Sequence, residues 1–508
     1  MPKEKITVRK LTVLALATGT CCLSAGAAQA ADDLLFALND PMAAFLETRA
    51  YAKKMGATAE FNKMEGVAYD KKNNKIYIAM SSIEKSMSDG QGDIKVAENP
   101  CGIVYEAKLD AGFNITNLKP VVTGGPYDKG AKSSVVSGFK DRCDVNNIAN
   151  PDGLFADQHG NLWISEDTSN HTNNALWRWD GKKLERFATV PTGAEITGII
   201  VTPNDDVMFN IQHPTAMSKF PYNRGTVGIV NGFKSSDKFS EVGVPKGDDI
   251  YDTKVAKGSY QILARVGEPI PNDLYGQRFG QVNRIDGTLM EMCNHPDGNM
   301  FLPITAKGDE AYLYTNYECR PGNVGKIYMK RSGDKWDVLD GENVNFASIK
   351  GTWNNCNASV TPWNTGLTSE EYEPVSAKSG WQKNVANMSD YLGKQASPYD
   401  YGYPIELIPD PKGESARTLV VKHYAMGRLS YEMSVVMNDK KTVYSGDDGS
   451  DVVLAKFVAD KEGDLSAGTL YAGKIAQKAD ASFVITWIEL GRSNNGDIYE
   501  AVKAVALK

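Results

Sequence analysis

The sequence feature that most limits the possible folds is a strand–turn–strand unit that recurs along the chain. Residues 64–79 and 150–165 each hold an acid followed by Gly, an apolar strand, a polar turn and a strand with an aromatic residue. Glu65 and Asp152 are these acids, and residues 196–209 repeat the unit without one. A repeat of about 40 to 50 residues built from short strands is typical of a β-propeller. We therefore predict an all-β fold, a propeller of about six blades with loop and short helical insertions.

The rest of the chain adds further hairpins and little helix. Residues 378–392 and 251–263 are the best helical candidates. No stretch rich in Pro and Ser divides the chain, so we predict a single propeller domain over residues 31–508. We expect this domain to be a monomer.

The first thirty residues have the pattern of a secretion signal peptide. A basic start is followed by an apolar run over residues 11–26 and by Ala28-Gln29-Ala30, which fits a cleavage site. The run is too short for a stable membrane span. We predict that residues 1–30 are a signal peptide and that the protein is periplasmic or secreted.

The charge of the chain argues against nucleic-acid partners. The formal net charge of −7 becomes about −10 when the four basic residues and one Glu of the leader are removed. Binding to nucleic acid needs a basic face, so we do not expect it. The chain has five histidines, which argues against a His-rich zinc centre. The plentiful Asp and Glu favour hard cations.

The cysteines leave one thiol over. Seven are present and two lie in the leader, so the mature chain has five. An odd number in an oxidising compartment leaves at least one unpaired. Cys101–Cys143 and Cys293–Cys319 are plausible pairs, although the sequence leaves the connectivity open, and Cys356 would then be free.

Cys356 stands in a stretch that suits metal binding. Residues 355–372 combine this thiol with the adjacent acids Glu370 and Glu371. A thiolate is a soft ligand and carboxylates are hard ligands, so together they fit a metal centre. The alternative is an ordinary blade turn with a buried free cysteine and exposed acids.

The repeat also predicts that acids from several blades converge. The first strand of each propeller blade lines the central channel, so Glu65 and Asp152 should point at the same axis. Like charges gathered there are costly unless a cation neutralises them. The wider candidate set is Glu166, Asp167, Glu370, Glu371, Glu432, Asp447 and Asp448. For any one of these, the alternative is a solvated turn residue.

Several short segments across the mature chain resemble one known family. They are Glu65 to Asp70, Asn150 to Gly153, Gln212 to Pro214, Asn355 to Glu371, Gly427 to Glu432, Gly446 to Asp448, Lys456 to Val458 and Gly468 to Tyr471. Together they resemble the PhoX-type alkaline phosphatases, which are secreted propellers with a centre of iron and calcium. The resemblance implies that Cys356 is an iron ligand and that Glu432, Glu65 and Asp152 are metal ligands.

The resembling segments also depart from the family pattern at phosphate-contacting positions. Lys63 stands where the family has an Arg, and Lys keeps the charge but loses the bidentate geometry. Tyr372 stands where the family has an Asn. The expected metal ligands are therefore retained while the substrate contacts differ. We expect Lys63 and Arg428 to assist in binding the phosphate.

Three functional hypotheses follow. The first is a secreted metal-dependent phosphomonoesterase that uses iron and calcium and acts on a small phosphorylated substrate. The second is a calcium-dependent propeller hydrolase of esters or lactones, in which Cys356 has no role. The third is a non-catalytic secreted propeller with structural calcium. Iron content separates the first hypothesis from the other two.

Overall fold

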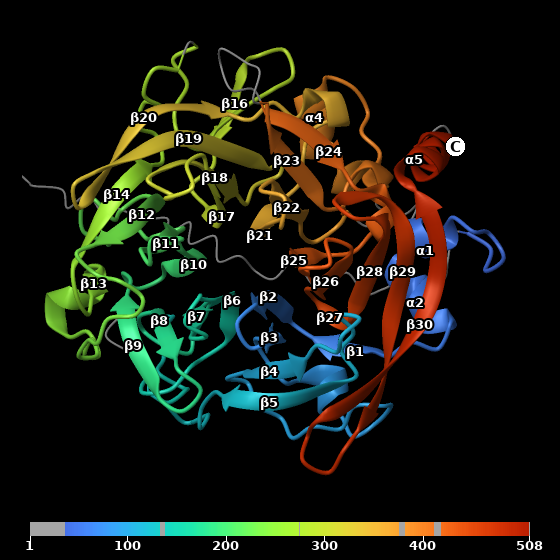
Figure 1. Ribbon diagram of the computed structural model, residues 1–508, viewed down its shortest axis with the longest axis horizontal. Coiled ribbons are helices and arrows are strands. Elements are labelled where there is room, and N and C mark those ends of the chain that lie inside the picture. The colour runs from blue at the N-terminus through green and yellow to red at the C-terminus, as the bar shows by residue number, and fades with distance from the viewer. Residues whose placement is uncertain (1–35, 133–137, 274, 375–380, 411–417, 507–508) are drawn as a thin grey trace, which may run out of the picture.

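The described strands form six blades in a ring, of which the first and sixth belong to one nine-stranded sheet, so the fold is a six-bladed β-propeller and the predicted fold class is confirmed (Figure 1). The structure, a computed structural model, describes residues 36–132, 138–273, 275–374, 381–410 and 418–506. The predicted signal peptide, residues 1–30, therefore lies outside the described residues. The single domain over residues 31–508 stays a prediction.

The innermost strand of each blade surrounds the central axis. These strands are β2 (Met64–Asp70), β6 (Pro151–Ala156), β10 (Glu195–Val201), β17 (Pro296–Pro303), β21 (Asn355–Val360) and β25 (Tyr431–Val436). Each contacts the inner strands of both neighbouring blades, and β25 contacts β2, so the ring is closed (Figure 1).

Three further strands complete each blade by antiparallel pairing. They are β3 (Lys75–Met80), β4 (Ile103–Lys108) and β5 (Asn117–Thr123) in the first blade; β7 (Leu162–Glu166), β8 (Ala175–Trp179) and β9 (Leu184–Thr189) in the second; β11 (Val207–Gln212), β12 (Thr226–Asn231) and β14 (Ser259–Arg265) in the third; β18 (Glu310–Tyr317), β19 (Asn323–Ser332) and β20 (Lys335–Asn343) in the fourth; β22 (Gly366–Glu370), β23 (Ile405–Pro409) and β24 (Thr418–Lys422) in the fifth; and β26 (Thr442–Asp447), β28 (Ala455–Lys461) and β29 (Asp464–Gln477) in the sixth.

Additional strands decorate or join the blades. The first and last blades are joined because β30 (Phe483–Asn494) pairs with both β29 and β5. The remaining strands are β1 (Ala59–Asn62), which pairs with β27 (Ser450–Val453); β13 (Lys254–Val255), which pairs with β9; and the hairpin of β15 (Gln281–Asn283) and β16 (Leu289–Met292).

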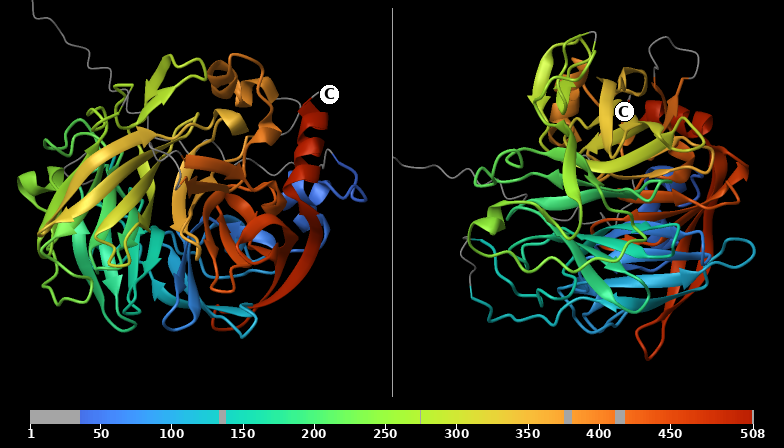
Figure 2. Two further views of the ribbon diagram at one scale, coloured as in Figure 1. Left: turned by 45° about the horizontal axis from the view of Figure 1, so that its top comes forward. Right: turned by 60° about the vertical axis from the view of Figure 1, so that its left-hand side comes forward.

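The helices lie outside the blades. They are α1 (Ala43–Leu46), α2 (Thr48–Lys54), α3 (Trp381–Asn384), α4 (Ala386–Leu392) and α5 (Asn495–Ala506). Phe45 of α1 and Ile498 of α5 share one buried cluster, so the two ends of the described chain pack together beside β30 (Figures 1 and 2). Among the helices that the structure describes, none is long and apolar enough to cross a membrane.

One of the two helical predictions is wrong. Residues 251–263 contain β13 and most of β14 instead of a helix. The outer edge of β12 offers unpaired backbone groups, and β14 satisfies them, so tertiary pairing overrides the local helical preference. The other prediction, residues 378–392, holds over α3 and α4, while its first residues lie outside the described chain.

The core is formed where neighbouring blades face each other. Trp163 and Phe187 of the second blade pack edge to face, with ring centroids 5.2 Å apart, and share a fully buried cluster with Phe209 of the third blade. Full burial of an apolar side chain of this size contributes about 1.5–3 kcal/mol. Each inner strand therefore packs between two neighbouring blades, and this packing fixes the position of its end at the channel mouth.

Both predicted disulfides are confirmed. Cys101 bonds to Cys143 and Cys293 bonds to Cys319. The second bond joins the residues just before β17 to the residues just after β18, so it fixes the loop that follows β18. Cys356 is a free, buried cysteine, as predicted.

Candidate metal centre

The candidate site is built by one backbone irregularity that recurs in all six described inner strands. In each blade, two residues of the inner strand lie opposite one residue of the next strand, which is a β-bulge. A bulge redirects a side chain, and these bulges occupy equivalent positions around the channel. Their first residues are Glu65, Asp152, Gly198, Asp297, Cys356 and Glu432. Five of the six blades thus present an acid or a thiol at the same level.

Glycine follows the acid in three bulges, and in two of them the neighbouring inner strand comes very close. A Cβ atom on Gly66 would lie 2.6 Å from the carbonyl oxygen of Asp152. A Cβ atom on Gly298 would lie 2.4 Å from the backbone nitrogen of Ala358. The Glu-Gly and Asp-Gly pairs of the sequence repeat therefore combine a side chain that faces the channel with a residue that lets the next blade approach.

A second ring of polar side chains lies beside the first. It comes from the residue directly after the second strand of each blade. These residues are Ser81, Asp167, His213, Glu318, Glu371 and Asp448. The two rings together concentrate carboxylates from all around the channel at one mouth.

Within the described chain, five groups of three side chains have ligand atoms within 4.8 Å of one another. The groups are Asp297–Glu318–Cys356, Cys356–Glu371–Glu432, Glu65–Asp152–Glu432, Glu65–Glu371–Asp448 and Asp152–Asp167–Glu195. We call the combined set the acid cluster. Each group shares a member with at least one other, so neighbouring cations bound here would share ligands.

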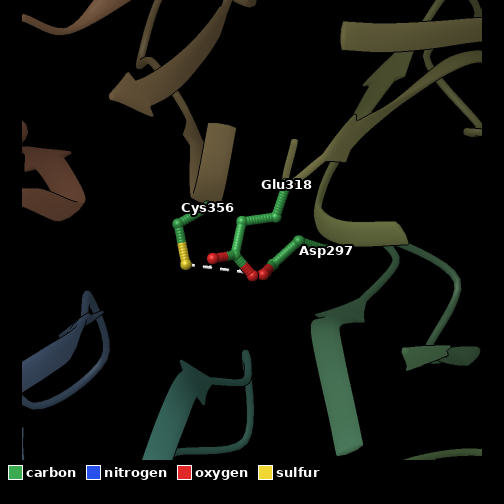
Figure 3. Close-up of side chains that lie close together, drawn as sticks. All are labelled: Asp297, Glu318 and Cys356. Carbon is green, nitrogen blue, oxygen red and sulfur yellow. Dashed lines mark hydrogen bonds between the residues drawn. The ribbon is translucent and has the colours of Figure 1, made fainter. Parts of the chain in front are cut away.

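Cys356 lies at the meeting point of two of these groups. Its Sγ is 3.4 Å from Oδ2 of Asp297, and Figure 3 shows Asp297 and Glu318 pointing toward the sulfur from the fourth blade. Burial, together with the nearby charges of Asp297 and Glu371, raises the pKa of the thiol well above its ordinary value. The isolated thiol is therefore unreactive, and a bound cation is what would favour the thiolate.

The carboxyl groups show the same electrostatic conflict. Burial, followed by repulsion from Asp167, raises the pKa of Asp152 to about 8. Burial is also the largest cause that raises the pKa values of Glu65, Glu371 and Glu432, and each of them is further raised by a neighbouring carboxylate. Like charges at this density ionise together only when positive charge is added.

The donor set fits metal cations. Carboxylate oxygens suit hard cations and a thiolate suits a transition metal. Oε1 of Glu432 is buried and has no hydrogen-bond partner among the described residues, although it sits between two of the groups. A buried carboxylate oxygen without a partner is costly, and a cation would remove that cost.

Lys63 supplies positive charge to one side of the acid cluster. Its Nζ lies 2.8 Å from Oδ2 of Asp448 and 3.0 Å from Oε1 of Glu65, and it donates to the hydroxyl of Tyr372 at 3.2 Å. Burial disfavours the charged ammonium, but Asp448 and Glu65 together raise the pKa of Lys63 well above its usual value. Lys63 therefore stays charged and is engaged by the protein's own carboxylates.

The structure brings eight of the sequence-predicted site residues to the acid cluster and places four elsewhere. The eight are Lys63, Glu65, Asp152, Asp167, Cys356, Glu371, Glu432 and Asp448. The other four, Glu166, Glu370, Asp447 and Arg428, have structural partners; Glu166 accepts from the indole of Trp177 at 2.7 Å and from the backbone of Ala149 at 2.9 Å.

Glu370 directly precedes Glu371, and Asp447 directly precedes Asp448. The second residue of each pair faces the channel, so the first points away from it. Oε1 of Glu370 lies 2.9 Å from Nζ of Lys422, and both side chains are fully buried. Asp447 forms a two-point ion pair with Arg49, at 2.5 and 3.0 Å. Neither carboxylate is among the ligand groups of the acid cluster.

Arg428 is used to hold loops together. Its Nε donates to the carbonyl of Tyr401 at 2.9 Å, and its Nη2 donates to the carbonyls of Pro374 and Pro398. The guanidinium is buried, and its Nε and Nη2 donate to backbone carbonyls. It is not positioned as a phosphate ligand.

Three acids of the cluster were missed by the sequence reasoning. Asp297 could have been found, because Pro296-Asp297-Gly298 repeats the Pro-Asp-Gly of the second blade. Glu318 gives a weaker signal, since it only follows a strand, as Glu371 does. Glu195, whose Oε2 lies 2.7 Å from Nε2 of His213, stands before the repeat unit in which no acid was found.

Comparison with known proteins assigns the chain to a family. The family model described as "Alkaline phosphatase PhoX" matches residues 35–215 and 324–507. No curated protein matches the sequence.

Solved structures with a similar fold include one phosphatase and two proteins described as lactonases. A Pseudomonas fluorescens PhoX in complex with vanadate is 19% identical with a TM-score of 0.34; the match covers 45% of this chain and about half, 54%, of that one. A Xanthomonas campestris gluconolactonase is 10% identical, with a TM-score of 0.38 over 78% and 85% of the two chains. A putative 6-phosphogluconolactonase from Bacteroides uniformis is 9% identical, with a TM-score of 0.35 over 83% and 87%.

Proposed function

The chain belongs to the alkaline phosphatase PhoX family, and on this basis we propose that it is a metal-dependent phosphomonoesterase that acts at the acid cluster. The observation that carries the proposal is the set of equivalent bulges. They bring Cys356, Glu432, Glu65 and Asp152, the four residues that resemble the family's metal ligands, to one channel mouth.

We propose that the cations are iron and calcium. Cys356 with Asp297, Glu318, Glu371 and Glu432 offers a thiolate among carboxylates, which suits iron, while the groups without Cys356 offer only oxygen, which suits calcium. When bound, the cations would supply positive charge to the phosphate oxygens and lower the barrier for attack on phosphorus.

The chain's own residues hold and orient this charge. Asn354 donates to Glu318 at 3.0 Å and to Glu371 at 3.1 Å, so two acids of the cluster are fixed by one amide. Gln212 donates to the other oxygen of Glu318 at 2.7 Å. These bonds limit the freedom of the ligands before any cation binds.

We propose that the protein works in the periplasm or outside the cell, as a monomer, on a small phosphorylated substrate. The two disulfides support an oxidising compartment.

The test is hydrolysis of p-nitrophenyl phosphate by the protein before and after dialysis against a chelator. The proposal predicts turnover that is lost on dialysis and restored by iron and calcium together. Cys356→Ala should lose the activity while its far-UV circular dichroism stays unchanged. Turnover that survives complete removal of metal would contradict the proposal.

A second candidate function is a calcium-dependent hydrolase of esters or lactones. The group Glu65–Asp152–Glu432 favours it, because this group offers only oxygen ligands and does not include Cys356. Hydrolysis of a lactone that needs calcium and survives Cys356→Ala would support this candidate. If calcium binds but neither substrate is turned over, the protein is a non-catalytic calcium-binding propeller.

A further inference from the structure

Arg320 lies at the rim of the acid cluster on a fixed loop. It follows Glu318 and Cys319 directly after β18, and the disulfide to Cys293 holds that loop. Its guanidinium carbon lies 5.3 Å from the ring centre of Trp353 and 5.8 Å from that of Tyr372. Contact with aromatic faces orients a guanidinium without occupying its N–H donors.

The charge of Arg320 is not neutralised by a partner. No hydrogen bond or ion pair joins its guanidinium to any residue in the described part of the chain, and its Nε is buried without an acceptor. Arg320 still lies close to the acid cluster, because it is two residues from Glu318 on the same loop and packs against Tyr372, whose hydroxyl accepts from Lys63. A buried donor without an acceptor beside a cation-binding cluster is suited to an anion that also contacts the cations.

The two residues that the sequence suggested for phosphate binding are already engaged. The ammonium of Lys63 pairs with Asp448 and Glu65, and the guanidinium of Arg428 donates to backbone carbonyls. Of these three basic residues in the described part of the chain, Arg320 is therefore the one whose donors remain available. A guanidinium also offers the paired N–H groups that match two phosphate oxygens.

We propose that Arg320 binds the phosphate group of the substrate at the acid cluster, with Trp353 and Tyr372 holding its guanidinium in place. The ligand class is a phosphate monoester or inorganic phosphate. This inference rests on the proposed function and assigns its substrate contact to a residue outside the segments that resemble the family.

The test compares Arg320→Gln, Arg320→Lys and wild-type protein, all with their metals bound. The readouts are KM for p-nitrophenyl phosphate, the inhibition constant of inorganic phosphate and the metal content. Loss of a charged hydrogen bond of this kind raises both constants by roughly 10- to 100-fold. Arg320→Gln should show this rise with unchanged metal content, and Arg320→Lys should show a smaller rise because it keeps the charge.

Arg492→Gln is the matched control, since Arg492 pairs with Asp460 at 3.0 Å on the exposed edge of β30. It should leave both constants unchanged. If Arg320→Gln loses metal or unfolds, the KM and the inhibition constant of Arg320→Lys with full metal content decide whether Arg320 binds the phosphate. Unchanged constants in a metal-loaded Arg320 variant overturn the inference but leave the phosphatase proposal standing. A metal-loaded wild type that neither hydrolyses the monoester nor binds phosphate overturns both.

Discussion

The two sides of the acid cluster balance their negative charge in different ways. On the Lys63 side, which comprises Lys63, Glu65, Tyr372 and Asp448, an ammonium lies within 3.0 Å of two carboxylates. On the Cys356 side, which comprises Asp297, Glu318, Cys356, Glu371 and Glu432, no described Lys or Arg forms an ion pair with a carboxylate. One side carries its own cation, whereas the other needs one from solution.

The pKa values express this contrast at Asp448 and Glu432, whereas the pKa of Glu65, on the Lys63 side, is raised by burial and by the charge of Asp448 despite its ion pair with Lys63. Burial opposes ionisation of Asp448, but the charge of Lys63, together with hydrogen bonds from Glu371, Lys63 and Tyr372, lowers the pKa of Asp448 below its ordinary value. Burial raises the pKa of Glu432, and the charge of Asp152 adds to that rise. The activity should therefore depend mainly on the metal bound at the Cys356 side. Cation binding at the Lys63 side should change only when Lys63 is removed.

The largest effect is expected for Glu432→Gln. Glu432 belongs to two ligand groups, and Gln keeps its shape but removes the charge. Even indirect partners of metal ligands cost 10- to 100-fold on substitution, so we expect kcat/KM to fall by at least about 100-fold, with loss of metal. Glu310→Gln, at a half-buried residue of β18 that is paired with Lys330 and belongs to none of the ligand groups, is the control and should keep full activity. Full metal content in Glu432→Gln would contradict the claim that Glu432 helps to bind the cation of the Cys356 side.

The neighbours Glu370 and Glu371 should respond in opposite ways. Glu370→Gln leaves the fully buried Lys422 without its carboxylate, which costs about 3–5 kcal/mol in the free energy of unfolding. Glu371→Gln should lose metal and activity but leave the stability of the metal-free protein unchanged or higher. Urea unfolding of both variants without metal, with metal analysis alongside, measures the difference. Equal loss of stability in the two variants would contradict this assignment.

The metal-free protein should become less stable as the pH rises. In the folded state the pKa of Asp152 is raised from 3.8 to about 8, so the carboxyl keeps a proton that the unfolded chain has released. This stabilising contribution is full below about pH 4 and is lost as the pH rises toward about 8. Thermal melting of metal-free protein between these values measures it. The melting temperature of Asp152→Asn should fall less over this range, and an equally steep fall would count against the mechanism.

The smallest effect is expected for Lys63→Gln, which makes the Lys63 side resemble the Cys356 side. Removing an ammonium from two carboxylates should tighten calcium binding by roughly tenfold, after allowance for solvent screening. Calorimetric titration of calcium into metal-free wild type and Lys63→Gln measures the change. Lys234→Gln, which removes an ion pair with Asp206 in the turn between β10 and β11, serves as the control. Equal calcium affinity in wild type and Lys63→Gln would mean that the lysine does not compete with cations.

The sequence was sufficient for the parts of the site that repeat. The strand–turn–strand unit predicted the propeller and placed Glu65 and Asp152 at equivalent positions, and the odd cysteine count singled out Cys356. The same repeat, followed to Pro296-Asp297-Gly298, would have added Asp297.

The rest depended on which face each side chain takes. Glu370 and Glu371 are adjacent in the sequence. Glu371 faces the channel because β22 ends at Glu370, beside the bulge of β21, and the sequence does not show this end point. Asp447 and Asp448 differ for the same reason. Arg428 could not be excluded from sequence, because its partners are backbone carbonyls supplied by loops far along the chain.

The most direct test of the central claim is the metal content of the wild-type protein and of Cys356→Ala, each purified from its native compartment without added metals. We expect iron and calcium in the wild type and loss of iron in the variant. Wild-type protein with calcium alone, or a Cys356→Ala variant that keeps its iron, would contradict the claim that the Cys356 side binds a metal through its thiolate.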